Sequence, residues 1–302
     1  MTSLDLTGLK AHHPLGFLAA CGTLSSAALI MADESPLLQW RRKASGWVAS
    51  IAASRLNRAN LVDSLMEHAN SIAALGAWSW STKIDDRRSF RRQARTALQK
   101  RDRHALGVLS AEASDIIHRS DALESTLFDL TSGNQRFLGS ICDIARNLSV
   151  DALSEALWGP WTYSDDAHSL GWDPQSQRLH ALRHKLPEKD KANRSVRAAI
   201  FLASQGLSLF PCFAVDGKLS TTGFHREDGE DWFVWPIWEE PITLDGLRSL
   251  LAHALNNDLK QRGVAVVYRC RRVRTGGSEG NYQVFSNAEE YPLTTRTRAT
   301  MP

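Results

Sequence analysis

The feature that most constrains this fold is an apolar stretch of very small residues near the start of the chain. Leu15 to Met31 follows a proline suited to the first turn of a helix, and Gly16, Ala19, Ala20 and Gly22 carry almost no side chain. Each interior glycine costs about 1 kcal/mol of helix propensity, so close packing must compensate for it. We therefore expect a buried helix that lies close to a neighbouring strand. The stretch is shorter than the roughly 20 apolar residues that cross a bilayer, so no membrane span is expected.

Strand-forming residues surround this helix. Leu4 to Leu9 favours a short strand before it. After it, Leu37 to Arg42 and Trp47 to Ala52 flank a Lys-Ala-Ser-Gly turn and predict a β-hairpin. Residues 1–55 therefore predict a β-α-β-β unit.

The periodicity of the next segment is helical. From Leu56 to Ile117, apolar residues recur at the spacing of a helix face, with breaks near residues 76–86 and near Asp102. We expect three helices here, which together form a basic helical insertion over residues 56–120.

The second half mixes short helices and strands, so the whole chain predicts an α+β fold, mixed α/β, with a small antiparallel sheet in its C-terminal half. Asp216-Gly217 is a strong hairpin signal, and Gly206 follows a helical pattern as a C-cap does. Residues 121–274 are expected to pack with the N-terminal unit, and residues 275–302 to form a loosely ordered tail. The expected strands cover residues 125–130, 207–215, 219–224, 231–238 and 264–273, and the expected helices cover residues 134–148, 150–157, 192–205 and 244–259.

Arginine is concentrated in the helical insertion. The net charge of the chain is only +3, so the distribution of charge points to a partner more than its total does. Arg88, Arg92 and Arg95 fall on one stripe of a helix, where like charges repel by about a few tenths of a kcal/mol per pair. Phosphates compensate such repulsion, so the stripe predicts a salt-sensitive reader of a nucleic-acid backbone, and a solvated face paired with distant acids is the alternative. The candidate contact residues here are Arg87, Arg88, Arg91, Arg92, Arg95, Lys100, Arg101 and Arg103.

A second basic run lies on the last expected strand. It comprises Arg269, Arg271, Arg272 and Arg274. Strand alternation places Arg269 and Arg271 on one face and Arg272 on the other. The run predicts a face that is exposed to solvent or binds an anion, and protection of an edge strand by charge is the alternative.

Two further features are compatible with nucleic-acid binding but indicate it less strongly. Asn134 and Gln135 stand at an expected helix entry, where free N–H groups meet phosphate or are simply capped. The ten tryptophans can stack on unpaired bases, although anchoring in a core or in a protein interface is the more frequent use of tryptophan.

The spacing of reactive side chains does not predict an enzyme. No nucleophile with its base, metal cluster or phosphate-binding loop is recognisable, so we expect no cofactor and no metal. Asp165, Asp166 and Asp173 leave a metal-dependent nuclease as the less favoured interpretation. Scattered cysteines among apolar neighbours indicate reduced, buried thiols in a cytoplasmic protein. These cysteines are Cys21, Cys142, Cys212 and Cys270.

Several short motifs resemble one protein family. The opening Leu-Thr-Gly-Leu-Lys-Ala-His-His-Pro-Leu-Gly-Phe-Leu-Ala-Ala-Cys-Gly is similar to the start of the large-subunit and related accessory proteins of type I-U (I-G) CRISPR systems. The further similar motifs are Leu170-Gly-Trp-Asp-Pro174, Ala181-Leu-Arg183, Ala203-Ser-Gln-Gly-Leu207, Phe210-Pro211, Thr221-Thr-Gly-Phe224 and Trp235-Pro-Ile-Trp238.

The resemblance implies a subunit of a type I interference complex, or Cascade, in antiviral defence. Such a subunit joins a protein complex that carries guide RNA, contacts the adjacent DNA motif and the displaced single strand, and helps to recruit the helicase-nuclease. In these complexes guide pairing reads the target sequence while protein reads shape and the adjacent motif. Expected partners are therefore that ribonucleoprotein complex, double-stranded and displaced single-stranded DNA, and other CRISPR-associated subunits, with no membrane. A protein scaffold of the same system that does not touch nucleic acid is the alternative.

Overall fold

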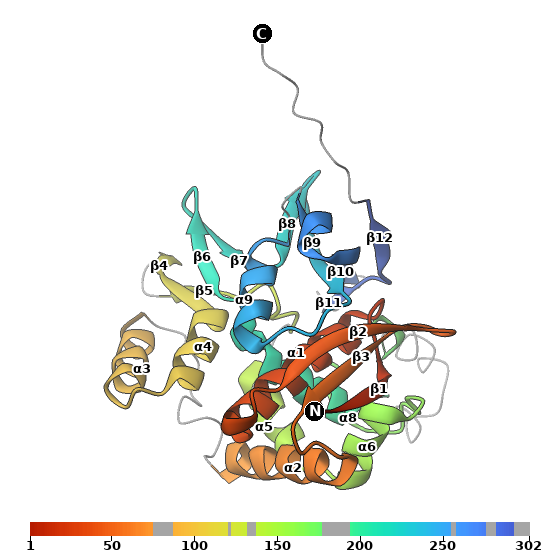
Figure 1. Cartoon of the computed structure of the whole chain (residues 1–302). Helices are drawn as coiled ribbons and strands as arrows, with labels where there is room; N and C mark the ends of the chain where they lie inside the picture. Colours follow the sequence, from red (N-terminus) through yellow and green to blue (C-terminus); the bar gives the residue numbers. More distant parts are fainter. Residues whose placement is uncertain are drawn as a thin grey trace, which may run out of the picture.

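Helices and antiparallel sheets alternate along the chain, which makes the protein a mixed α+β fold as predicted (Figure 1). One hydrophobic core reaches from Leu6 to Phe285 and includes residues from the N-terminal unit, the insertion and the C-terminal half. Among the described helices, none combines the length and hydropathy that crossing a bilayer requires. The computed structural model describes residues 1–74, 87–119, 122–131, 137–176, 194–254, 258–275 and 282–292.

The N-terminal β-α-β-β unit is confirmed. Its three strands form a sheet of order β1-β3-β2, and β2 and β3 pair as the predicted hairpin, with Leu37 opposite Ala52. The hairpin turn ends at Gly46, whose φ of 100° is a conformation that side chains disfavour. The elements are β1 (Thr2–Lys10), α1 (Pro14–Ile30), β2 (Leu37–Lys43) and β3 (Gly46–Ala53).

Helix α1 is buried along nearly its whole length, and its closest neighbour is a helix, not the expected strand. At Gly22, α1 crosses α8 (Arg197–Gly206) so closely that a Cβ added to Gly22 would lie 1.6 Å from the main-chain oxygen of Leu202. A Cβ at Gly206 would lie 2.9 Å from the main-chain nitrogen of Gly22. Helix α8 ends at Gly206 as predicted, although the residue that caps it is Leu207. Gly206 itself has a φ of −76° and serves this crossing. At Gly16 the close neighbour is Lys10, at the end of β1.

The insertion holds the three predicted helices, but its last part is a strand. Residues 113–117, expected as helix, belong to β4, which pairs with β5. The strand expected at residues 125–130 is likewise misplaced, because Phe128 and Leu130 lie in a turn that buries both side chains. The helices here and just after are α2 (Arg58–Ala74), α3 (Arg87–Gln99), α4 (Arg103–Glu112), α5 (Phe137–Arg146) and α6 (Val150–Trp158), and the strands are β4 (Ala113–Arg119) and β5 (Ala122–Ser125).

The C-terminal half forms the predicted antiparallel sheet, with strand order β11-β10-β9-β8 and β12 also paired with β10. The hairpin between β6 and β7 turns at Asp216 and Gly217, whose φ angles of 50° and 73° match the predicted turn. Two expectations fail, since residues 207–209 form a 3-10 helix instead of a strand and α9 stops at Ala252. The elements are β6 (Cys212–Val215), β7 (Lys218–Thr221), β8 (Phe224–Glu227), β9 (Glu230–Trp238), α9 (Leu244–Ala252), β10 (Val264–Thr275), β11 (Tyr282–Phe285) and β12 (Glu289–Tyr291).

The segment expected as a loose tail is therefore partly ordered. Strands β11 and β12 add to β10, so residues 282–291 complete the sheet. Strand β11 buries Val284 and Phe285, and both strands gain backbone hydrogen bonds from β10.

Aromatic side chains join this sheet to the N-terminal unit. Trp235 on β9 donates its indole N–H to the carbonyl oxygen of Ala11 at 2.8 Å, and Trp238 donates to that of Leu38 at 3.0 Å. Trp172 donates in the same way to Phe128 at 2.9 Å. These tryptophans are core anchors, because burial removes them from any base. Trp78 and Trp80 lie outside the described residues.

Substituting alanine for glycine at two helical positions tests the crossing of α1 and α8. At Gly22 the new methyl group collides with main chain, and overpacking of this kind costs about 1–3 kcal/mol. At Gly246 in α9 the nearest heavy atom would be 3.4 Å from the new Cβ, so a gain in helix propensity of up to about 1 kcal/mol is expected to prevail. Urea denaturation should show a lower unfolding free energy for Gly22→Ala and a higher one for Gly246→Ala. Stabilisation by both substitutions would contradict the crossing.

Candidate nucleic-acid interface

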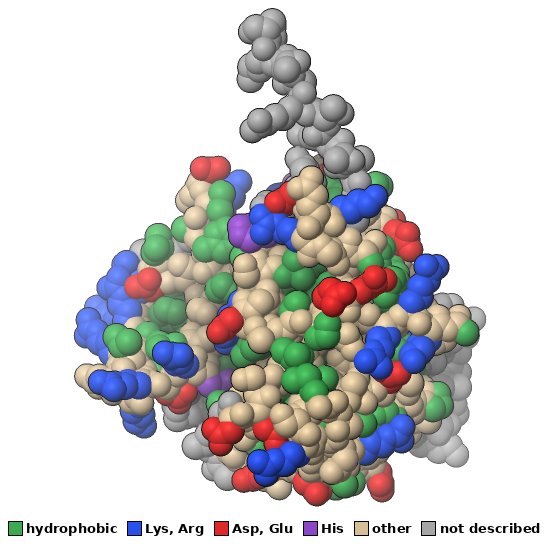
Figure 2. All heavy atoms as spheres, viewed as in Figure 1, with side chains coloured by type: hydrophobic (Ala, Val, Ile, Leu, Met, Phe, Trp, Pro, Cys, Tyr) green, Lys and Arg blue, Asp and Glu red, His purple; other side chains and the backbone are tan. Residues whose placement is uncertain are grey.

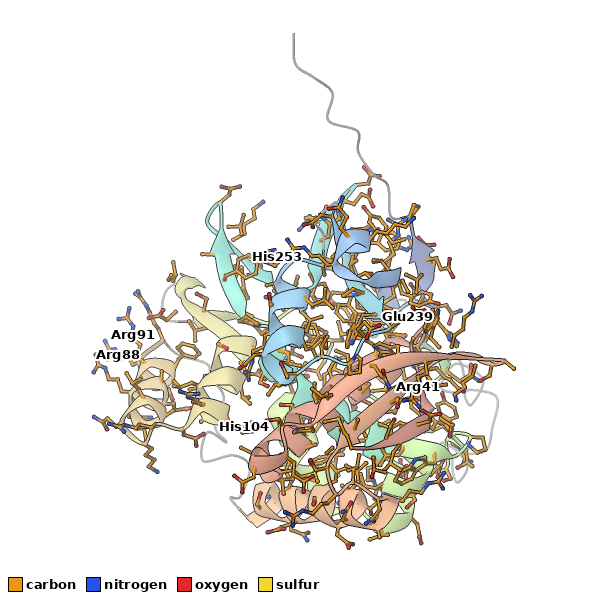
Figure 3. All side chains as sticks on the ribbon, viewed as in Figure 1. Arg41, Arg88, Arg91, His104, Glu239 and His253 are labelled. Atoms are coloured by element: carbon orange, nitrogen blue, oxygen red, sulfur yellow. The ribbon has the colours of Figure 1, made fainter. Side chains whose placement is uncertain are left out.

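The predicted arginine stripe lies on the exposed face of α3. Arg88, Arg91, Arg92 and Arg95 are all exposed and line one shallow hollow, while Phe90 on the opposite face is buried in the core. In Figure 3, Arg88 and Arg91 point outward from α3, away from the rest of the protein. Figure 2 shows Lys and Arg side chains gathered at this end of the molecule. The helix therefore presents a cationic face to solvent.

Few acids accompany these arginines. Arg91 Nε lies 2.7 Å from Asp115 Oδ2 of β4, and both side chains are partly exposed. In the described part of the chain, no carboxylate pairs with Arg88, Arg92 or Arg95. The alternative of a solvated face already neutralised by acids thus applies, within that part, to Arg91 alone.

The other candidate residues of the insertion flank the stripe. Lys100 and Arg101 form an exposed turn between α3 and α4, where Arg101 has a φ of 54°. Arg103 is the first residue of α4, directly after the N-cap Asp102. Arg87, the first residue of α3, is half-buried. The exposed members extend the positive charge from α3 to the start of α4.

Helix α4 holds the arginine helix against the rest of the protein. Gly107 of α4 lies so close to Ser208 that an added Cβ would be 3.1 Å from the Ser208 Cβ. His104 stacks edge-on to His68 of α2, with ring centroids 5.8 Å apart, and the His68 Nε2 lies 3.0 Å from the side-chain oxygen of Gln205. Burial and the nearby His68 lower the pKa of His104 to about 4, so the pair is neutral at neutral pH.

A buried acid lies where α4 ends and β4 begins. The Glu112 side chain is buried, and its Oε1 has no hydrogen-bond partner among the described residues. Burial raises the pKa of Glu112 to about 8, and the carboxylate of Asp129 adds to the effect. Next to it, the Cys212 thiol donates to the carbonyl oxygen of Ala111 at 3.2 Å. The junction therefore favours a protonated, uncharged Glu112.

Arg269, the first arginine of the second basic run, is already paired with acidic side chains. Arg269 Nε lies 2.7 Å from Glu289 Oε1, and its Nη1 lies 2.8 Å from Glu227 Oε2. Its guanidinium also covers the Trp232 ring at 4.0 Å and the Tyr291 ring at 5.0 Å. With its side chain only 20% exposed, Arg269 fastens β12 and β8 to the sheet and has little left for a ligand.

The remaining arginines of β10 differ in exposure. Arg272 is partly buried and donates from Nη2 to the carbonyl oxygen of Asp129 at 3.0 Å, and burial lowers its pKa. Arg271 and Arg274 are exposed. Strand β10 has β9 on one side and β12 and β11 on the other, so the interpretation as edge-strand protection is wrong.

The acids considered for a nuclease have structural contacts. Asp165 Oδ2 accepts the main-chain N–H of Arg197 at 2.9 Å, and Asp173 Oδ1 accepts that of Gln175 at 2.8 Å and lies 3.2 Å from His13 Nε2. Across the described residues, no group of three or more His, Cys, Asp or Glu side chains could hold a metal ion. Asn134 and Gln135 lie outside the described residues, as does Ala181-Leu-Arg183. The cysteines are free, three of them buried and Cys212 half-buried.

The sequence did not predict a groove that lies between α4 and α9. This groove is lined by Arg103 of α4 and Arg248 of α9. Arg248 stands alone in the sequence, so no local pattern marks it.

Comparisons with known proteins add no relative. No family model matches the chain, and no curated protein matches it. Fold and site together define an α+β protein with an exposed arginine face on a projecting helix, where Arg88, Arg92 and Arg95 have no carboxylate partner among the described residues.

Replacing the buried acid tests how the insertion is attached. The folded protein raises the pKa of Glu112 from 4.5 to about 8, so its stabilising contribution is complete below pH 4.5 and is lost as the pH rises towards 8. We expect Glu112→Gln to remove a decline on the order of a few kcal/mol in unfolding free energy across that range. Urea denaturation at intervals from pH 5 to pH 8 measures it, with the exposed Glu230→Gln as control. A parallel decline in wild type and Glu112→Gln would contradict this account.

Proposed function

We propose that this protein is a nucleic-acid-binding, non-enzymatic subunit of a type I CRISPR interference complex. The observation that supports it best is the face of α3, where Arg88, Arg92 and Arg95 meet solvent without a carboxylate partner in the described part of the chain. Resemblance of the opening motif to type I-U (I-G) subunits supports membership of the complex.

The chemistry of the face favours phosphates over base edges. Arginines at helical spacing repel one another, and a polyphosphate relieves that repulsion while releasing counterions. Each guanidinium can donate two parallel hydrogen bonds to phosphate oxygens. Binding at α3 is therefore expected to be salt-sensitive and to carry little sequence preference, with Arg271 and Arg274 as additional contacts.

The proposal includes the partners implied by the resemblance. The proposed nucleic-acid ligands are the duplex next to the target and the displaced single strand, and guide pairing supplies sequence recognition. The guide-RNA complex and the helicase-nuclease are the protein partners. A cytoplasmic location belongs to the same proposal.

A scaffold function is the second candidate, and exposed apolar residues favour it. Phe213 and Val215 of β6 are 44% and 46% exposed, and Ile116 of β4 is 68% exposed. Strands β4 and β6 are in contact, so the three side chains belong to one projecting region. Such a patch suits a protein partner. Co-purification that persists at high salt and without RNA would favour the scaffold, because apolar contacts strengthen there.

Charge reversal on α3 tests the proposal directly. The triple variant Arg88→Glu, Arg92→Glu, Arg95→Glu should bind a DNA duplex more weakly, and the slope of log affinity against log salt should fall by about 3, since each lost phosphate contact removes about 0.9. Fluorescence anisotropy over a potassium chloride series measures both quantities, on the protein alone and on its complex.

A second triple variant controls for net charge. Arg55→Glu, Arg146→Glu and Arg226→Glu change the same number of exposed arginines elsewhere on the surface. If both variants lost the same affinity for DNA, α3 would contribute only through the overall charge of the protein. If the α3 variant kept its full affinity and slope while folded by circular dichroism, the proposed interface would be wrong.

A further inference from the structure

A groove between α4 and α9 brings together two arginines from distant parts of the sequence. Arg103 at the start of α4 lines one side and Arg248 of α9 the other, and the hollow between them has a volume of about 380 Å³. In Figure 1, α9 lies beside α4 of the insertion. The volume is close to the lower end of the roughly 300–1,000 Å³ range of ligand pockets.

The groove offers hydrogen-bond donors and cationic charge. A guanidinium carries five N–H donors, which suit the oxygens of an oxyanion. Arg248 Nη1 lies 2.7 Å from Oδ1 of the largely exposed Asp245 on its own helix, and such surface pairs hold a cation weakly. Among the described residues, no carboxylate pairs with Arg103. Ser208 makes only a long hydrogen bond of 3.5 Å, to Gln205, so its hydroxyl can turn into the groove and donate.

The remaining lining is uncharged, and Leu209 and Pro211 are its larger apolar members. Gly107, Ser110 and Thr222 leave room between the arginines, and the described lining residues include neither an acid nor an aromatic ring. Without an aromatic ring there is no stacking platform for a base, so recognition must come from charge and hydrogen bonds. The acid next to Arg103, Asp102, is already occupied in accepting the N–H of Ala105 at 2.9 Å.

We infer that this groove binds a phosphate group, held between Arg103 and Arg248. Phosphate is favoured over a carboxylate because three or more oxygens can meet two forked guanidinium groups from opposite walls. The groove shares Arg103 with the basic run that begins on α3, but it contains none of Arg88, Arg92 and Arg95. The inference therefore does not depend on the function proposed for the face of α3. A phosphate of this kind can come from a free nucleotide or from a polynucleotide strand.

Calorimetric titration of the full chain at constant ionic strength tests the inference. The probes are sodium pyrophosphate, adenosine monophosphate and a twelve-nucleotide oligothymidylate. The first variant is Arg103→Gln with Arg248→Gln. The second is Ala252→Glu, which adds a carboxylate at an exposed lining position and removes only a methyl side chain. The control is Arg55→Gln with Arg146→Gln, in which Arg146 makes the same i,i+3 pair with Asp143 as Arg248 makes with Asp245.

The expected result is that at least one probe binds the wild-type chain and loses about tenfold or more in affinity in both groove variants but not in the control. Binding of pyrophosphate or adenosine monophosphate identifies a free phosphate ester as the source. Binding of the oligothymidylate alone identifies a strand. If no probe binds, or if groove variants and control lose affinity equally, the inference is overturned. The α3 variants are scored on duplex DNA, so failure of one site leaves the other result standing.

Discussion

The backbone contact between α1 and α8 is the constraint on which the rest of the structure depends. It requires a glycine on each helix, Gly22 and Gly206, because any side chain would enter the other backbone. With the two helices this close, the N-terminal sheet, α2, α5 and the C-terminal strands can share one core. Close-packed interiors transmit such a constraint, since a displaced helix leaves voids or collisions around it. The positions of the arginine face of α3 and of the groove between α4 and α9 depend on this shared core.

Helix α3 gains its orientation through α4. The α4 helix meets the core through Gly107, His104 and the buried Glu112 at its end. Helix α3 packs on α4 and buries Phe90 in the core. Two groups of altered pKa, Glu112 and His104, lie in that attachment, and both are uncharged around neutral pH. An uncharged junction keeps the desolvation cost low where the insertion joins the body. The arginines in turn stay at the far side, in water.

The same side chain has opposite roles in the two basic runs. Arg269 is enclosed by Glu227, Glu289 and the Trp232 ring, so it is a structural tie for the last strand. Arg92 is exposed, and its Nη2 lies 3.5 Å from the Ser89 hydroxyl. Clusters of arginine in a sequence thus do not by themselves define a ligand site. Neighbouring acids and rings, supplied by other elements, decide whether a guanidinium is available.

Local patterns in the sequence determined the β-α-β-β opening, the turn at Asp216 and Gly217, the helix break at Asp102 and the arginine stripe, because turn chemistry and periodicity involve near neighbours in the chain. Tertiary structure alone decided that α8 is the partner of Gly22, that β11 and β12 complete the sheet, and that Arg103 and Arg248 line one groove. It also turned residues 113–117 into strand, since β5 offers them a pairing partner. The physical reason is that these outcomes depend on contacts between distant segments, whose energies leave no periodic trace in either segment.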